Sequence, residues 1–217
     1  MSSPLDIYWH LRLQDAAKSL RKNAFEVSIV ENVDEAHALL LDTILPESGA
    51  KTVAFGGSAS MAACGIVDAL LKRTDIDVLN TVSPLVPPAE MIERRHRALL
   101  VDLFVTGSNA VTLDGKLVNR DMIGNRTGAI SFGPKKVVLI VGRNKLVANL
   151  EEGMKRVRDI AAPANAIRLN RKTPCVATGR CMDCNSPERI CNVWSIQEKC
   201  FPALRTHVIL VNDTLGL

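Results

Sequence analysis

The chain has 217 residues, of which 47% are hydrophobic and 23% charged, and this composition is typical of one soluble globular domain with a sizeable core. Its net charge is only +4, and one Tyr, two Trp and five Phe provide no basic aromatic surface for stacking bases, which argues against a nucleic-acid partner. The longest apolar runs reach about seven residues, against the roughly 20 that a membrane-spanning helix needs. The first residues lack the pattern of a secretory signal, so we expect no membrane span, a cytoplasmic location and reduced thiols.

Strand and helix patterns alternate along the first half of the chain. Apolar residues at helical spacing predict an opening helix of about 20 residues that stops at Asn23. Asn32 followed by Glu35 is typical of a capped helix start. The elements that follow the opening helix are predicted as a strand at 25–30, a helix at 32–45, a strand at 52–55, a helix at 59–71, a strand from 77, a helix near 89–98 and a strand at 100–105.

The second half of the chain adds a hairpin and a cysteine-rich segment. Asp114-Gly115 suits a two-residue hairpin turn, because both central residues must adopt positive φ. The expected elements are hairpin strands at 110–113 and 116–119, a helix at 122–132, a strand at 136–141, a helix at 145–161 and a last strand at 207–211. Such alternation predicts an α/β fold, mainly a parallel sheet covered by helices, with an inserted β-hairpin. We expect a single domain over residues 1–217, with a Cys-rich metal-binding segment at 174–200.

Five of the six cysteines lie in that segment, and four of them show the spacing Cys-x5-Cys-x2-Cys-x6-Cys. Four thiolates in a loop-rich segment are what an iron–sulfur cluster or a zinc ion requires, and the x2 pair lets one turn supply two ligands. The sequence favours an iron–sulfur cluster of the [4Fe–4S] type over structural zinc, and leaves unliganded thiols as a third interpretation. The predicted metal ligands are Cys175, Cys181, Cys184 and Cys191.

Two polar turns follow predicted strands, and a third polar cluster follows the hairpin. Gly56-Gly57-Ser58 lies where a strand passes into a helix, a place where bare backbone N–H groups can meet an anion. Carboxyl ends of parallel strands share one edge of the sheet, and open α/β sheets bind their ligands there. The predicted ligand-binding residues are Gly56, Gly57, Ser58, Gly107, Ser108, Asn109, Asn119, Asp121, Asn125 and Arg126. No Ser/His/Asp order or carboxylate pair indicates an acid–base machine, so no catalytic residue is assigned.

Four segments together resemble the lactate-utilization family, the LUD or DUF162 family. These are Ala54–Ser58, Thr106–Ala110, Leu113–Asn119 and Pro174–Asn192. The resemblance implies a fold like that of ribose-5-phosphate isomerase, glucosamine-phosphate deaminase and the CoA-transferases. It also implies a part in oxidising L-lactate to pyruvate through a multi-subunit, iron–sulfur-containing system.

The middle segment is also similar to the branch of initiation factor 2B and methylthioribose-phosphate isomerase. Asn109 stands where that branch has an acidic residue, and an amide cannot serve as a carboxylate base, which argues against isomerisation by that route.

Two hypotheses follow. In the first, the chain is a subunit for lactate oxidation or related electron transfer that binds a small anionic metabolite; because one cluster stores one electron, redox partner subunits must complete the two-electron chemistry. In the second, it is a stand-alone binding or isomerase-like protein for a sugar-phosphate or CoA-type metabolite, with a structural zinc site. Either hypothesis is compatible with a homo-oligomer.

Overall fold

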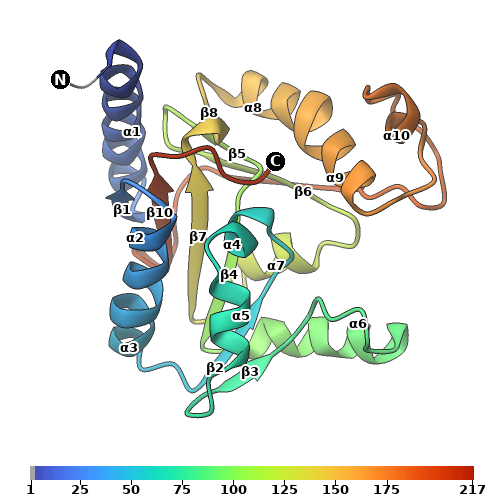
Figure 1. The fold of residues 1–217 in the computed structure, drawn as a ribbon, viewed down its shortest axis with the longest axis horizontal. Helices are drawn as coiled ribbons and strands as arrows, with labels where there is room; N and C mark the ends of the chain where they lie inside the picture. The colour runs from blue at the N-terminus through green and yellow to red at the C-terminus, as the bar shows by residue number, and fades with distance from the viewer. Residues whose placement is uncertain (1–2) are drawn as a thin grey trace.

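The computed structural model describes residues 3–217 as an α/β fold built on two sheets (Figure 1). The main sheet is entirely parallel, with the strand order β1-β10-β7-β4-β2-β3. Its strands are β1 (Glu26–Val30), β2 (Thr52–Phe55), β3 (Asp77–Leu79), β4 (Leu103–Gly107), β7 (Lys136–Gly142) and β10 (Thr206–Val211). The predicted α/β fold with a mainly parallel sheet is therefore confirmed.

The second sheet has four strands in the order β8-β5-β6-β9. It contains the predicted hairpin, in which Val111 pairs with Leu117 across the turn at Asp114-Gly115. The turn itself differs from the prediction: Gly115 has φ +82°, but Asp114 does not adopt positive φ. The Gly115 N–H donates to the Thr112 carbonyl at 2.9 Å, so the connection is longer than the predicted two residues. The strands are β5 (Ala110–Thr112), β6 (Leu117–Asp121), β8 (Leu146–Val147) and β9 (Val193–Gln197).

Helices cover both faces of the main sheet because its strands are apolar on both faces. In β7, Val138 and Ile140 pack into one core with the helices that follow β1 and β2, and Leu139 and Val141 pack into the other with α1 and the small sheet. The helices of the first face are α2 (Val33–Ala38), a π-helical turn (Leu39–Ile44), α3 (Leu45–Ser48), α4 (Ala59–Ala63) and α5 (Ile66–Leu71). Those of the second face include α1 (Pro4–Lys22) and α7 (Asn125–Ser131).

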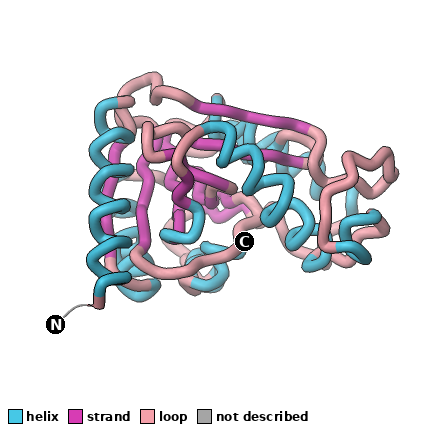
Figure 2. Tube along the Cα trace, turned by 90° about the horizontal axis from the view of Figure 1, so that it is seen from above, coloured by secondary structure: helices cyan, strands magenta, loops and turns pink. Residues whose placement is uncertain are grey.

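The remaining helices are α6 and α8 to α10, of which α8 packs on the small sheet. Three consecutive helical segments form one long stretch: α8 (Leu150–Arg156), a π-helical turn (Val157–Ala161) and α9 (Ala162–Arg168). The first part of this stretch packs on the small sheet through Met154 and Val157. The others are α6 (Pro88–Arg97), which runs into a 3-10 turn (Ala98–Leu100), and α10 (Pro174–Thr178). Figures 1 and 2 place α1 and the cysteine-rich segment around α10 at opposite ends of the molecule.

Several predicted boundaries are wrong for local reasons. The helix expected at 59–71 is broken into α4 and α5 at Gly65, which has φ +64°. The strand expected at 100–105 begins only at Leu103, because the chain is still in its 3-10 turn at Leu100. The helix expected from Lys145 starts after Asn149, whose side chain accepts the backbone N–H of Glu152 at 3.0 Å.

Within residues 3–217, no helix is both long and apolar enough to cross a bilayer.

Candidate functional site

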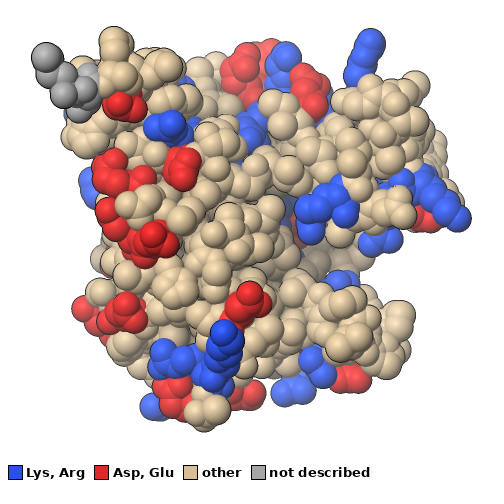
Figure 3. Space-filling model, viewed as in Figure 1, with Lys and Arg blue, Asp and Glu red and all other residues tan. Residues whose placement is uncertain are grey.

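A cavity of about 370 Å³ opens at the carboxyl edge of the main sheet. The turns after β2 and β4 and the 3-10 turn after β7 supply one wall, and the end of β6 with the start of α7 supplies another. Residues of α6 and α9 contribute the rim. Figure 3 shows this face hollowed, with Lys and Arg side chains gathered beside the hollow. Open α/β sheets bind ligands at this edge, so the cavity is the candidate binding site.

Most of the predicted ligand-binding residues line this cavity. Gly56 and Asn119 do not: the Gly56 N–H donates to the Val105 carbonyl within the sheet, and Asn119 is 1% exposed behind the cavity wall. The eight that line the cavity are Gly57, Ser58, Gly107, Ser108, Asn109, Asp121, Asn125 and Arg126.

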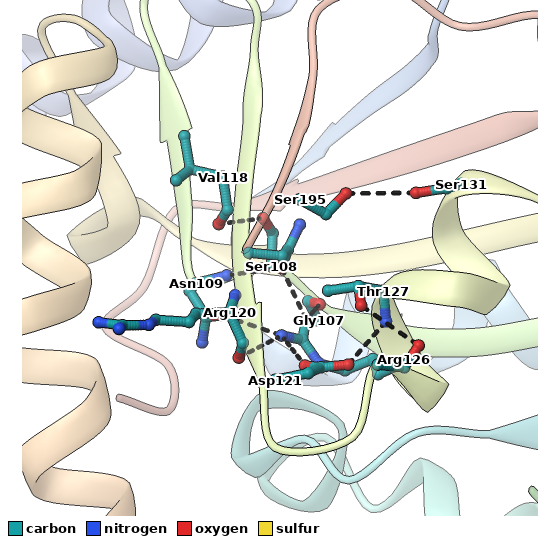
Figure 4. Close-up of polar contacts among 12 residues, drawn as sticks. Gly107, Ser108, Asn109, Val118, Arg120, Asp121, Arg126, Thr127, Ser131 and Ser195 are labelled. Atoms are coloured by element: carbon teal, nitrogen blue, oxygen red, sulfur yellow. Dashed lines mark hydrogen bonds and ion pairs between the residues drawn. The ribbon is translucent and has the colours of Figure 1, made fainter. Parts of the chain in front are cut away.

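Arg126 holds the wall together through a buried hydrogen-bond network (Figure 4). Its Nε donates to Oδ1 of Asp121 at 3.0 Å, and its Nη2 lies 2.8 Å from the same oxygen. The remaining donors reach the Gly107 carbonyl (Nη1, 2.9 Å), Asn119 Oδ1 (Nη1, 2.6 Å) and Asn109 Oδ1 (Nη2, 2.9 Å). Arg126 therefore ties the end of β4 to the end of β6, and its own charge is largely satisfied within the protein.

Three other arginines at the cavity have donors without hydrogen-bond partners. The Nε atoms of Arg95, Arg120 and Arg171 are buried and have no hydrogen-bond partner among residues 3–217. The Arg120 guanidinium lies over the Trp194 ring, 4.5 Å from its centre, and burial lowers the pKa of Arg95. These Nε atoms are fully enclosed, so the surface that the three arginines present to the cavity is formed by their other atoms. The one acidic side chain of the lining is Asp121, which already pairs with Arg126.

Lys145 extends the cationic wall from the turn after β7. It is 4% exposed, and its Nζ lies 2.8 Å from Ser60 Oγ. Burial lowers the pKa of Lys145 to about 7, and the charges of Arg156 and Arg126 contribute in the same direction. Neutral and protonated amine therefore coexist near neutral pH in this wall.

The two glycines after β2 have different roles. A Cβ on Gly56 would lie 2.9 Å from Thr106 Oγ1 and 3.0 Å from Arg126 Cγ, so glycine is needed there for packing. A Cβ on Gly57 would meet only Val82 Cγ1, at 3.8 Å, in ordinary contact. Gly57 therefore leaves room in the cavity without being required by the packing around it.

The four predicted metal ligands lie around a second, much smaller cavity of about 20 Å³. All are free thiols. Burial raises the pKa of Cys191; Arg120 and Arg189 oppose this shift, and Cys181 and Cys184 reinforce it. Arg189 binds the loop by donating to the Cys184 and Cys191 carbonyls.

The four cysteines match a metal centre in donor type and in number. Four soft donors line one small cavity, with Arg189 beside them to offset thiolate charge. Among residues 3–217, no three His, Cys, Asp or Glu side chains are arranged closely enough to hold a metal ion. The other two thiols lie elsewhere: Cys200 accepts the Thr206 N–H in the core beside α1, and burial raises the pKa of Cys64 to about 11 in the opposite core.

A family model described as the LUD domain matches residues 13–211. The chain belongs to the LUD-domain family. A crystal structure of a DUF162 family protein from Deinococcus radiodurans is similar to this LUD-domain chain, with 16% sequence identity, 95% of this chain and 97% of that chain covered, and a TM-score of 0.47. No curated protein matches the chain.

Sequence reasoning on this LUD-domain chain misses much of the cationic lining. The charge pattern predicts a solvated helix face for Arg95, and the apolar pattern predicts a helix start for Lys145. For Lys145 a signal is available, because a polar residue a few positions after a predicted parallel strand is carried to the carboxyl edge. Arg120 belongs to the polar cluster after the hairpin, for which the sequence predicts ligand binding, whereas the sequence does not reveal Arg168 and Arg171.

Proposed function

We propose that this LUD-domain chain binds a small anionic metabolite in the cationic cavity and works as a subunit of a lactate-utilization system. The observation that carries the proposal is the charge of the cavity lining, in which five arginines and Lys145 stand against a single acidic side chain, Asp121. A carboxylate or phosphate would supply paired acceptor oxygens in the geometry that guanidinium groups favour. A neutral ligand would leave the positive charge uncompensated.

The family name supports lactate utilization, and the charge of the cavity supports an acid as the ligand. Both L-lactate and pyruvate carry one carboxylate, which can pair with one guanidinium group. A second candidate is favoured by the excess of cations: a phosphorylated or CoA-type metabolite carries more negative charge and fills more of the roughly 370 Å³.

A thermal-shift titration tests this proposal. The native protein is compared with the variants Arg171→Gln and Gly57→Leu in L-lactate, pyruvate, a sugar phosphate and coenzyme A. We expect at least one of these anions to raise the Tm of the native protein and to have a weaker effect on both variants, since bound ligand stabilises the folded state by mass action. If no anion in the panel raises the Tm, the cavity is not an anion site and the proposal fails.

For the cofactor, we propose that Cys175, Cys181, Cys184 and Cys191 hold an iron–sulfur cluster, with structural zinc as the alternative. Their shared cavity and thiol chemistry support this assignment. A cluster there would supply one-electron storage, so lactate oxidation would require redox partner subunits. Iron and acid-labile sulfide in protein purified without air would support the cluster, whereas stoichiometric zinc in a colourless protein would support the alternative.

A further inference from the structure

Lys145 is a buried amine without an acidic partner among residues 3–217. Lysine is almost never fully buried unless it is paired, because an ammonium group loses its hydration there. The hydrogen-bond partner of Lys145 in this part of the chain is a neutral hydroxyl, Ser60 Oγ at 2.8 Å. The charged groups that act on it, Arg126 of α7 and Arg156 of α8, are both cations. This environment disfavours the ammonium form, and the pKa near 7 agrees with that geometry.

The hydrogen bonds of Ser60 leave the amine free to react. Ser60 Oγ donates to the Leu215 carbonyl at 3.4 Å, so its oxygen accepts a hydrogen from the Lys145 amine. A neutral amine bonded in this way still has its lone pair available. Since Lys145 lines the large cavity and Ser60 lies behind it, the reactive position belongs to Lys145 and Ser60 acts as a positioning residue.

We propose that Lys145 is a catalytic nucleophile that forms an imine with the carbonyl carbon of a 2-oxo acid bound in the cavity. The inference rests on the proposed anion-binding function and narrows its substrate class. A 2-oxo acid has two features that match the cavity: a carboxylate for the cationic lining, and beside it an electrophilic carbonyl that the Lys145 amine can attack. A 2-hydroxy acid such as L-lactate has the carboxylate but no carbonyl, so it can bind without reacting.

The step balances without an oxidant or reductant. The Lys145 nitrogen lone pair forms the new bond to the carbonyl carbon, and the C=O π pair moves to the oxygen, which takes up one of the two amine hydrogens as a proton. The two amine hydrogens and the carbonyl oxygen then leave as one molecule of water, and a C=N double bond joins carbon to nitrogen. Desolvated lysines with a lowered pKa are suited to this reaction because the amine need not first give up a proton to solvent.

Reductive trapping tests the assignment. The full chain is incubated near pH 7 with glyoxylate, pyruvate or 2-oxoglutarate and with sodium cyanoborohydride, which reduces an imine to a stable secondary amine. Intact mass and peptide mapping then locate the adduct. We expect at least one of these acids to modify Lys145 ten-fold or more above Lys135, a lysine whose side chain is 80% exposed, and L-lactate to give no adduct.

Two variants serve as controls. Lys145→Met removes the nucleophile and should abolish the adduct, and Lys145→Arg keeps a cation but forms no imine. Both variants should unfold in one cooperative urea transition, which would show that loss of the adduct is not loss of the fold.

The outcomes separate the two proposals. A rise in Tm with a 2-oxo acid but no selective adduct at Lys145 overturns the imine and leaves the anion site standing. If no anion raises the Tm and no adduct forms, both proposals are overturned. Modification spread evenly over exposed lysines also overturns the imine, because it would show no more reactivity at Lys145 than at any surface amine.

Discussion

Replacing Arg126 tests whether the buried network, rather than packing alone, holds the ends of β4 and β6 together. The variant Arg126→Met keeps a long apolar side chain but removes every donor. Its partner Asp121 is 7% exposed and would be left as a buried carboxylate with one remaining bond, from the Thr127 N–H at 2.7 Å. Breaking a buried ion pair from one side costs about 3–5 kcal/mol, mostly through the uncompensated charge.

The side-chain amides that lose their bond to Arg126 keep other partners, which places the expected loss of stability near the lower end of that range. Asn109 Oδ1 still accepts the Arg120 N–H at 2.9 Å, and Asn119 Oδ1 still accepts the Asn109 N–H at 3.1 Å, so neither oxygen is stranded. We therefore expect a loss of about 3 kcal/mol, near the lower end of the range. For a chain of this size it corresponds to a fall in Tm of about 6–12 °C.

Urea unfolding of four proteins measures the effect: the native chain, Arg126→Met, Asp121→Asn and the double variant. The double variant should be more stable than the sum of the two single losses predicts, because the amide that replaces the carboxylate has no charge to be stranded. Arg73→Met, which breaks an ion pair with the exposed Asp75, is the matched control and should cost about 0–1 kcal/mol. A loss below about 1 kcal/mol for Arg126→Met, or strict additivity of the two single losses, would show that the ion pair does not stabilise the fold.

Three further predictions concern the lysine, the glycine turn and the cysteines. Because the Lys145 pKa is about 7 in the fold and about 10.4 in an unfolded chain, unfolding takes up a proton between these values, so native stability rises with pH across that window. Lys145→Met should therefore gain most over the native chain below pH 7 and least near pH 10, as urea midpoints at pH 6 and pH 9 would show; a pH-independent difference would contradict the lowered pKa. Gly57→Leu should unfold at the native temperature without ligand but lose the ligand-induced rise in Tm, and an unchanged response would place the ligand elsewhere. Cys181→Ser with Cys184→Ser should abolish bound metal in elemental analysis while Cys200→Ser retains it; full metal in the double variant would rule out the proposed ligand set.

The framework is predictable from sequence because its signals are local. β2 and β7 are short runs of apolar residues, and the hairpin is marked by Asp114-Gly115. The boundary error at Gly65 has a local cause, and the absence of β9 from the predicted elements has a tertiary one. At Gly65 a helical apolar pattern continues across a residue that takes a left-handed conformation, and β9 is a strand of modest apolarity whose pairing with β6 is decided by distant residues.

The residues of the candidate site also divide into those that can be predicted from sequence and those that cannot. Strand-end residues such as Ser58 and Asn109 are predictable, because parallel strands bring their carboxyl ends to one edge whatever the details of packing. Arg95 and Arg171 reach the cavity only because α6 and the segment after α9 are folded over that edge. Nothing in their sequence neighbourhoods distinguishes them from surface arginines, so they require the three-dimensional structure.

The position of β10 has a consequence for how the chain is made. This strand follows all the others in sequence, yet it lies between β1 and β7, and all its residues are buried. During translation, β1 therefore has no neighbouring strand, and one edge of β7 stays unpaired, until residue 211 has left the ribosome. Unpaired apolar strand edges are the surfaces through which nascent chains associate wrongly. The protein is thus expected to depend on protection during synthesis, and a ribosome stalled before residue 206 should present a nascent chain that proteases cut readily.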